Sequence, residues 1–306
     1  MIPAFPQFKH LELQDFGEVS GYISQYRHYS DWNIISLWSW NSGQTCRVSL
    51  LHKNLVIEMA HYVSQKKVYA FLGPHRTQQT INKLAQHAFE QTGSAKIHLV
   101  PESALTPALL AHPESRIRLD RDNFDYIYSL NLLREMKGAK YRGKKNFVNR
   151  FVRSYEKSCS VLELDISNPQ HISSIQEMFQ RWETTQKKSR SETQFELNAV
   201  MTLIKHATHF PDLITIGLYV KDVLVGISIN SRTDDDYATN HHELADVSYI
   251  GSFQYLRLKT AEVLYQKGYR HINFEQDLGV PGLRRAKKSW RPVKYMRKAT
   301  ITVLQK

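Results

Sequence analysis

The chain contains 306 residues, 42% of them hydrophobic and 23% charged, which is the composition of a folded globular protein with room for one large or two ordinary domains. No apolar run approaches the roughly 20 residues that span a bilayer, and the N-terminus has no basic region followed by an apolar core, so we expect a soluble, cytoplasmic protein. Two cysteines outside any CxxC pattern argue against a disulfide scaffold or a cysteine-rich metal site.

The net charge of +12 is concentrated in two segments. Residues 137–157 hold eight Lys or Arg against one Glu, and residues 284–298 hold eight against none. These 36 residues carry +15, whereas the other 270 carry −3. Such clustering predicts a polyanionic partner such as tRNA. Two solvated surface faces with no specific partner are the alternative.

The first half of the chain reads as interleaved helices and strands. Helices are predicted over residues 15–26 and 30–40, a hairpin over 46–60 that turns at Lys53-Asn54, and a strand over 68–73. An amphipathic helix over 77–93 and extended segments over 96–100, 115–120 and 124–130 follow. The core candidates of the second helix are Trp32, Ile35, Leu37, Trp38 and Trp40.

The second half continues in the same style. A strand is predicted over 161–166, helices over 171–187 and 192–210, a hairpin over 213–231 that turns at Lys221-Asp222, and a strand over 237–244. A helix over 252–269, a strand over 271–276, a short basic helix over 282–288 and a strand over 293–304 complete the chain. This order resembles that of an acyltransferase domain of the GNAT type.

Two sequence stretches carry a closer resemblance. FDYIYSLNLLREMKGAKYRGKKNFVNRF (124–151) and INFEQDLGVPGLRRAKKSWRP (272–292) resemble the paired signature of a bacterial family related to the C-terminal domain of phosphatidylglycerol lysyltransferases. The resemblance implies a transferase with two tandem GNAT-like domains of mixed α/β structure. We expect these domains at residues 1–128 and 129–306, with the active site in the second.

The resemblance also bears on the donor. Fem-type relatives take an amino acid from aminoacyl-tRNA, whereas other GNAT proteins take acetyl from acetyl-CoA. A CoA enzyme is expected to carry a [QR]xxGx[GA] turn that holds the pyrophosphate, but this chain has DVSYIGSFQYLRLK (246–259), which keeps only Gly251. We therefore expect aminoacyl-tRNA as the donor, with acyl-CoA as the less favoured choice and no tightly bound cofactor or metal.

The acceptor is expected to be an amine or hydroxyl on a small molecule, a peptide or a lipid headgroup. The membrane-spanning region of the full lysyltransferases is absent from this sequence, which argues against a lipid acceptor but leaves peripheral membrane contact open. A protein that binds nucleic acid or an anionic membrane, and that has kept the fold without catalysis, is the alternative.

The basic segment 141–157 is predicted to form a cationic amphipathic helix. Its apolar side comprises Phe147, Val148, Phe151, Val152 and Tyr155. Its polar side could bind tRNA phosphate or ribose, and a surface helix without a specific partner is the other interpretation. The candidate donor-binding and phosphate-binding residues of the two segments are Arg142, Lys144, Lys145, Asn146, Asn149, Arg284, Lys287 and Lys288.

Three carboxylates are candidates for the catalytic base. Strand alternation along HINFEQD would place Glu275 and Asp277 on one face, about 6–7 Å apart. Either could accept a proton from the acceptor, although Asp277 could instead form an ion pair with Arg284. Glu243 is the third candidate, because acetyltransferases often carry their base on the corresponding strand. His241 and His242 would face opposite sides of a regular strand, so we interpret them as a structural pair.

Overall fold

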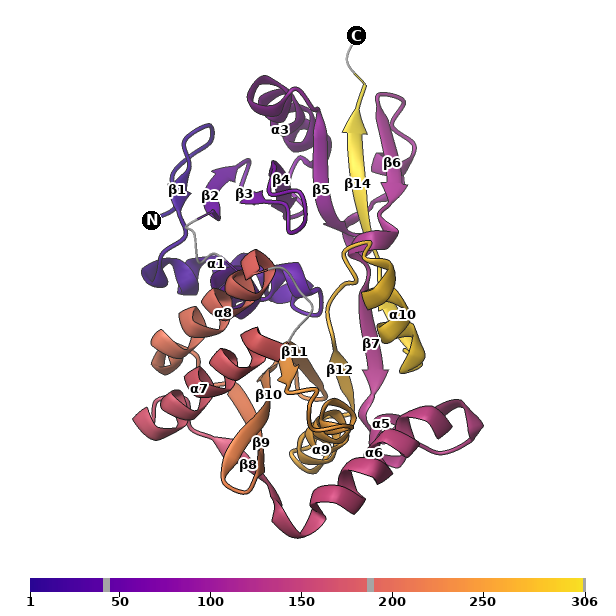
Figure 1. Cartoon of the computed structure of the whole chain (residues 1–306). Coiled ribbons are helices and arrows are strands. Elements are labelled where there is room, and N and C mark those ends of the chain that lie inside the picture. The colour runs from indigo at the N-terminus through magenta and orange to yellow at the C-terminus, as the bar shows by residue number, and fades with distance from the viewer. Residues whose placement is uncertain (41–44, 186–189, 305–306) are drawn as a thin grey trace. The chain divides into compact units, whose positions relative to one another are not determined.

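The computed structural model describes residues 1–40, 45–185 and 190–304 (Figure 1). The chain forms two compact units. Unit 1 comprises Met1–Tyr126, Gln276–Lys287 and Tyr295–Lys306, and unit 2 comprises Ile127–Glu275 and Lys288–Lys294. Each unit combines helices with a sheet of parallel and antiparallel strand pairs, which is the predicted mixed α/β class.

The sheet of unit 1 has the strand order β1-β2-β3-β4-β5-β14-β6. Its strands are β1 (Lys9–His10), β2 (Arg47–Leu51), β3 (Asn54–Ala60), β4 (Lys67–Leu72), β5 (Lys96–Pro101), β6 (Ser115–Leu119) and β14 (Lys298–Val303). The first hairpin turns at His52 and Lys53, which both have positive φ, because Leu51 pairs with Asn54. The predicted turn at Lys53-Asn54 was therefore one residue late.

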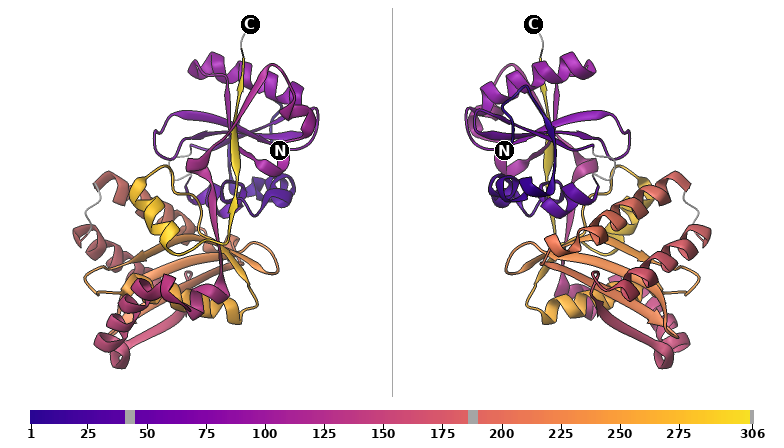
Figure 2. Two further views of the ribbon diagram at one scale, coloured as in Figure 1. Left: turned by 90° about the vertical axis from the view of Figure 1, so that its right-hand side faces the viewer. Right: turned by 90° about the vertical axis from the view of Figure 1, so that its left-hand side faces the viewer.

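Helices cover both faces of this sheet, as the two side views in Figure 2 show. The helices are α1 (Phe16–Ile23), α2 (Ile34–Ser39), α3 (Thr77–Thr92) and the short α4 (Pro107–Leu110). Alternation along β3 separates two cores, since Leu55 and Ile57 pack with the α1 and α2 side, whereas Val56 packs with α3. Of the predicted core residues, Trp32, Ile35 and Leu37 are buried, while Trp38 and Trp40 are half-buried.

The second sheet has the strand order β13-β7-β12-β11-β10-β9-β8. Its strands are β7 (Asp125–Ser129), β8 (Cys159–Leu164), β9 (Leu213–Val220), β10 (Val223–Arg232), β11 (Tyr237–Ala245), β12 (His271–Asn273) and β13 (Lys294–Met296). The predicted turn at Lys221-Asp222 joins β9 to β10, and both residues have the positive φ that a tight hairpin turn requires.

The helices of unit 2 are α5 (Leu130–Glu135), α6 (Arg142–Tyr155), α7 (Pro169–Thr185), α8 (Arg190–Lys205) and α9 (Ser252–Gln266). Helix α9 packs on β10 and β11, and α5 and α6 pack on α9. Helix α10 (Pro281–Ser289) begins in the unit 1 stretch and ends in the unit 2 stretch. Residues 186 and 187, the end of the helix predicted over 171–187, lie outside the described residues.

The chain returns to unit 1 after completing most of unit 2. The expected boundaries, 1–128 and 129–306, assign residues 276–287 and 295–306 to the second domain, whereas both stretches lie in unit 1. The physical reason is strand pairing, because β14 inserts between β5 and β6 and is hydrogen-bonded to both. A single boundary in the sequence cannot describe these units, because each is built from segments that are not consecutive in the chain.

Candidate active site and cationic helix

The two carboxylates after β12 do not share a strand face. Strand β12 ends at Asn273, and Glu275 has a φ of +55°, which belongs to the left-handed region. The Glu275 amide donates to Asn273 Oδ1 at 2.6 Å, so a local turn replaces the expected alternation. Glu275 falls in unit 2 and Asp277 in unit 1. Because of the turn at Glu275, the prediction that regular strand alternation places Glu275 and Asp277 on one face is wrong.

Asp277 lies in a hydrogen-bonded ion-pair cluster within unit 1. Its side chain is fully buried and accepts from Arg284 Nε at 2.9 Å and Nη2 at 2.7 Å. Arg121 Nη1 donates to it at 3.2 Å and the Tyr126 hydroxyl at 2.5 Å. The Gly279 amide donates to the second oxygen at 3.0 Å. Both carboxylate oxygens are thus occupied by donors.

This environment makes Asp277 a weak base. Burial opposes its ionisation, but the hydrogen bonds from Arg284, Tyr126 and Gly279 outweigh burial and lower the pKa of Asp277. The partner ion pair also raises the pKa of Arg284. The geometry favours the ion-pair interpretation of Asp277 and Arg284. Lys287 lies on the same helix, with its ammonium 5.9 Å from the centre of the Tyr126 ring.

Glu243 on β11 is held in a buried ion pair. Arg257 Nε donates to Glu243 Oε2 at 2.9 Å, and the two side chains are 8% and 3% exposed for Arg257 and Glu243 respectively. The guanidinium of Arg257 also lies 4.2 Å from the centre of the Phe274 ring and 4.8 Å from that of Trp290. A carboxylate that is paired and enclosed in this way serves packing more readily than proton transfer.

A β-bulge on β11 sets His241 apart from its neighbours. Ile229 of β10 pairs with His242, but the next residue, Asn230, pairs with Asn240, so His241 has no residue directly opposite on β10. An extra residue of this kind bends a strand and re-aims a side chain, and bulges are frequent beside active sites. The assumption of a regular strand therefore failed at this position.

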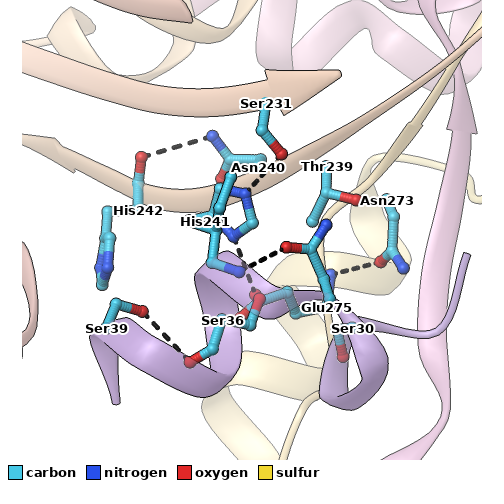
Figure 3. A network of polar contacts seen from close by, with 12 residues as sticks. Ser30, Ser36, Ser39, Ser231, Thr239, Asn240, His241, His242, Asn273 and Glu275 are labelled. Atoms are coloured by element: carbon cyan, nitrogen blue, oxygen red, sulfur yellow. Dashed lines mark hydrogen bonds and ion pairs between the residues drawn. The ribbon is translucent and has the colours of Figure 1, made fainter. Parts of the chain in front are cut away.

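His241 links Ser231 and Glu275 within unit 2 (Figure 3). Its Nε2 lies 2.8 Å from Ser231 Oγ, and its Nδ1 lies 3.8 Å from Glu275 Oε1. Burial, together with the neighbouring His242, lowers the pKa of His241 to about 3, so its imidazole is neutral at physiological pH. Sequence reasoning singled out Glu275 but missed its contact with His241 and the contact of His241 with Ser231.

Buried polar side chains surround this bulge. Asn240 Nδ2 donates to Ser228 Oγ at 3.0 Å, to Asn230 Oδ1 at 2.9 Å and to the His242 carbonyl at 3.3 Å. The buried polar residues of β10 and β11 are Ser228, Asn230, Ser231, Thr239, Asn240, His241 and His242. The signal in the sequence was the polar composition of two strands, SINSR and ATNHHE, that had to be central in a sheet.

Helix α6 presents most of the predicted phosphate-binding residues to solvent. Its apolar side is narrower than expected, because Val148 and Phe151 are buried whereas Phe147 is 46% exposed. Lys144 differs from the other cations, since its ammonium lies 4.8 Å from the centre of the Trp290 ring, and burial and Arg257 lower its pKa. The exposed candidates on α6 are Arg142, Lys145, Asn146 and Asn149.

The two basic segments meet within unit 2. Trp290, which follows α10, contacts Lys144, and its carbonyl accepts a hydrogen bond from the Tyr141 hydroxyl at 3.5 Å. Lys288 at the end of α10 is exposed in the same stretch of unit 2. Residues near 140 and 290 of the chain therefore form one cationic region, although Arg284 and Lys287 belong to the unit 1 stretch of the helix.

The start of α9 is covered by α6. Gly251 precedes α9 with a φ of +91°, and a Cβ at this position would lie 2.2 Å from the carbonyl oxygen of Phe147. Gly251 and Ser252 are both buried. In Figure 1 helix α6 lies next to α9. The helix N-terminus that would hold a CoA pyrophosphate is thus packed against protein backbone.

Comparisons with solved structures define the fold class. A conserved protein of unknown function from Bacteroides thetaiotaomicron VPI-5482 aligns with a TM-score of 0.79 at 22% identity, over 99% of this chain and 100% of the other. The FemX structure aligns with a TM-score of 0.57 at 9% identity, over 97% of each chain. The two mixed sheets therefore make a tandem GNAT-like fold.

The family follows from a second comparison. The family described as "Phosphatidylglycerol lysyltransferase, C-terminal" matches residues 26–300, so the chain belongs to this family. The C-terminal domain of an Agrobacterium fabrum protein assigned as a lysylphosphatidylglycerol synthetase aligns with a TM-score of 0.59 at 14% identity, over 95% of this chain and 92% of that domain. No curated protein matches the chain. Family and fold relate the chain to GNAT-like acyltransferases.

A separate observation concerns membranes. Across residues 1–40, 45–185 and 190–304, no helix combines the length and the apolar character that crossing a bilayer demands.

Proposed function

We propose that this chain is an aminoacyltransferase that takes an aminoacyl group from aminoacyl-tRNA and delivers it to an amine or hydroxyl acceptor. The proposal joins the relationship to GNAT-like acyltransferases with two features of unit 2. These are the exposed cationic helix α6 and the carboxylate of Glu275 beside the bulge on β11. The resemblance to Fem-type enzymes agrees with this donor.

The packing of α6 against Gly251 is the observation that supports aminoacyl-tRNA over acyl-CoA as the donor. An acyl-CoA enzyme of this fold needs free backbone amides at the start of α9 to hold a pyrophosphate. Here α6 packs against the residue that precedes α9, so closely that a Cβ on residue 251 would lie 2.2 Å from the Phe147 carbonyl oxygen. The same helix exposes Arg142 and Lys145, which suit the phosphates of a nucleic acid. One element therefore disfavours CoA and favours tRNA.

Glu275 is the best placed of the three candidate bases. Its side chain is 17% exposed, whereas those of Asp277 and Glu243 are 0% and 3% exposed and are paired with arginines. In the proposed reaction its carboxylate accepts a proton from the acceptor as the acceptor nitrogen or oxygen attacks the ester carbonyl. The ester C–O bond then breaks, and the proton that Glu275 accepted passes to the departing oxygen, so that the tRNA leaves with a ribose hydroxyl.

A polyanion-binding protein without catalysis is the second candidate. The enclosure of Asp277 and Glu243 in ion pairs favours it, since an ion pair with an arginine gives each of them a structural role. Such a protein would bind tRNA through α6 and leave its aminoacyl ester intact. Binding alone therefore does not separate the two candidates, but transfer does.

Donor choice provides the test. The protein is incubated with a pool of radiolabelled aminoacyl-tRNAs and, separately, with labelled acetyl-CoA, and the label is followed into a cell extract. We expect enzyme-dependent label only from aminoacyl-tRNA. Label that arises only from acetyl-CoA would overturn the proposal, and tRNA binding without any transfer would favour the second candidate.

A further inference from the structure

The bulge on β11 offers Glu275 a fixed partner. We infer that His241, held by Ser231, is a positioning residue that orients the Glu275 carboxylate for proton transfer. The inference rests on the proposed function, in which Glu275 is the base, and it adds two residues that belong to different strands. Figure 3 shows His241 and Glu275 pointing toward each other from β11 and from the turn after β12.

The contact with Ser231 fixes one side of the imidazole ring. Nε2 of His241 is 2.8 Å from Ser231 Oγ, which is a normal hydrogen-bond distance. Both residues are buried, with exposures of 4% for His241 and 0% for Ser231, so water does not compete for this bond. A flip of the ring would remove it, and the orientation of the imidazole is therefore set.

The second ring nitrogen then faces the carboxylate. Nδ1 is 3.8 Å from Glu275 Oε1, which is longer than a hydrogen bond but close enough for a direct electrostatic interaction. A neutral imidazole carries its proton on one nitrogen only. An Nδ1 lone pair directed at a carboxylate would be repelled, whereas an Nδ1–H is attracted. The structure therefore assigns the proton to Nδ1, with Nε2 accepting from the Ser231 hydroxyl.

The backbone around Glu275 is held in one conformation. Its backbone holds a φ of +55°, which costs free energy for a residue with a side chain, and the Asn273 side chain secures this turn at 2.6 Å. On the other side, Asn240 fixes the bulge through its bonds to Ser228 and Asn230. Two rigid segments thus present His241 and Glu275 to each other.

His241 is a poor candidate for the base itself. Its Nε2 lone pair accepts from Ser231 in the assigned tautomer, and its Nδ1 already carries a proton. It therefore has no site left that could take a proton from an acceptor. The carboxylate of Glu275, by contrast, is partly exposed, and a carboxylate oxygen can accept a proton. His241 accordingly acts through Glu275.

Two amide substitutions separate the two ring nitrogens. In His241→Asn the amide nitrogen stands near the position of Nδ1, and in His241→Gln it stands near that of Nε2. We expect H241Q to lower kcat for aminoacyl transfer by roughly 10–100-fold, with KM for aminoacyl-tRNA nearly unchanged. A loss of this size is usual when a residue that holds a functional side chain in place is replaced. H241N should recover most of that loss because it still offers a donor to Glu275.

Equal kcat per folded molecule in wild type, H241N and H241Q would overturn the inference, as would an equal loss in both variants. Ser231→Ala, which removes a single oxygen, is the second variant if either amide fails to fold. It should also lower kcat, because the imidazole then loses the hydrogen bond to Ser231 that fixes Nε2.

The inference about His241 can also be tested by a measurement that does not depend on transfer activity. The ¹⁵N chemical shifts of His241 in the full chain at neutral pH report which nitrogen carries the proton. We expect protonated Nδ1 and unprotonated Nε2, and a mixed tautomer in S231A. A wild-type protein with protonated Nε2 would refute the positioning role. Absence of transfer by wild type would instead refute the proposed function, whatever the tautomer.

Discussion

At Asp277 the contacts argue for an anchoring role. Asp277→Asn keeps the shape of the side chain but removes the charge that Arg284 and Arg121 share. Breaking one partner out of a buried ion pair typically costs about 3–5 kcal/mol, so we expect a clear loss in the free energy of unfolding. Transfer activity per folded molecule should stay close to that of wild type. Denaturant unfolding and a transfer assay on the folded fraction measure the two quantities.

The same residue predicts an acid-sensitive stability. The folded-state pKa of Asp277 is lowered, so its contribution is present above its unfolded pKa of about 3.9 and is lost as pH falls through the lower folded value. The melting temperature of wild type should therefore decline more steeply below about pH 4 than that of D277N. Parallel curves for the two proteins would show that the cluster contributes nothing to acid stability.

The sequence could predict a contact between residues when opposite charges at a short spacing were enough to suggest it. The pairing of Asp277 with Arg284 was one of two interpretations that their spacing allowed, and the contacts select it. The contacts of His241 with Ser231 and Glu275 were not predictable, because strand alternation places adjacent residues on opposite faces, and a bulge cancels that rule. Nothing in the local sequence marks where a bulge will form.

At the scale of elements, α6 makes the most direct prediction. Lys145→Glu reverses an exposed charge on the helix face that we propose contacts tRNA. Affinity for tRNA should fall, and the slope of log K against log[salt] should decrease by about 1. Lys205→Glu, at an exposed lysine at the end of α8, is the matched control. Equal affinities for the two variants would place tRNA elsewhere.

The junction of α6 with α9 gives a second prediction at this scale. Gly251→Ala introduces a Cβ where the φ is +91° and where the Phe147 carbonyl leaves no space. The left-handed conformation alone costs about 1–2 kcal/mol for a residue with a side chain, and the clash adds to it. We expect a lowered melting temperature. Gly143→Ala on α6, which meets nothing within 4 Å, is the control and should cause no comparable loss.

Helices and most strands were predictable because their periodicity is a local property. The basic helix predicted over 141–157 is α6 at Arg142–Tyr155, and the basic helix predicted over 282–288 is α10 at Pro281–Ser289. The strand predicted over 271–276 was too long, since the left-handed Glu275 ends its alternation. A positive φ at a residue other than glycine leaves little trace in sequence.

On the scale of the whole chain, Lys298 joins segments that are far apart in sequence. This fully buried lysine forms ion pairs with Asp31 and with Asp125, the latter at 2.7 Å, all within unit 1. Lys298→Met would remove the lysine that pairs with two buried carboxylates, so we expect a loss of about 3–5 kcal/mol in the free energy of unfolding. Lys294→Met, at an exposed position four residues earlier, should change it by less than about 0.5 kcal/mol. Similar unfolding curves would contradict this account.

The return of the C-terminus to unit 1 was the largest feature missing from the sequence interpretation. Strand β14 was predicted as a strand, but its neighbours β5 and β6 lie about 180 to 200 residues earlier in the chain, and such pairing depends on tertiary contacts. The buried charge of Lys298 looked like part of a basic surface segment. Composition reports that a charge exists, whereas burial depends on the assembled fold.

The central claim, aminoacyl transfer with Glu275 as base, is tested most directly by single-turnover transfer from labelled aminoacyl-tRNA in wild type and Glu275→Gln. Loss of a general base typically costs about 10²–10⁴ in rate, so we expect E275Q to fall by that order while its affinity for aminoacyl-tRNA stays nearly constant. Transfer by E275Q at the wild-type rate, or no transfer by a folded, tRNA-binding wild-type protein, would contradict the account.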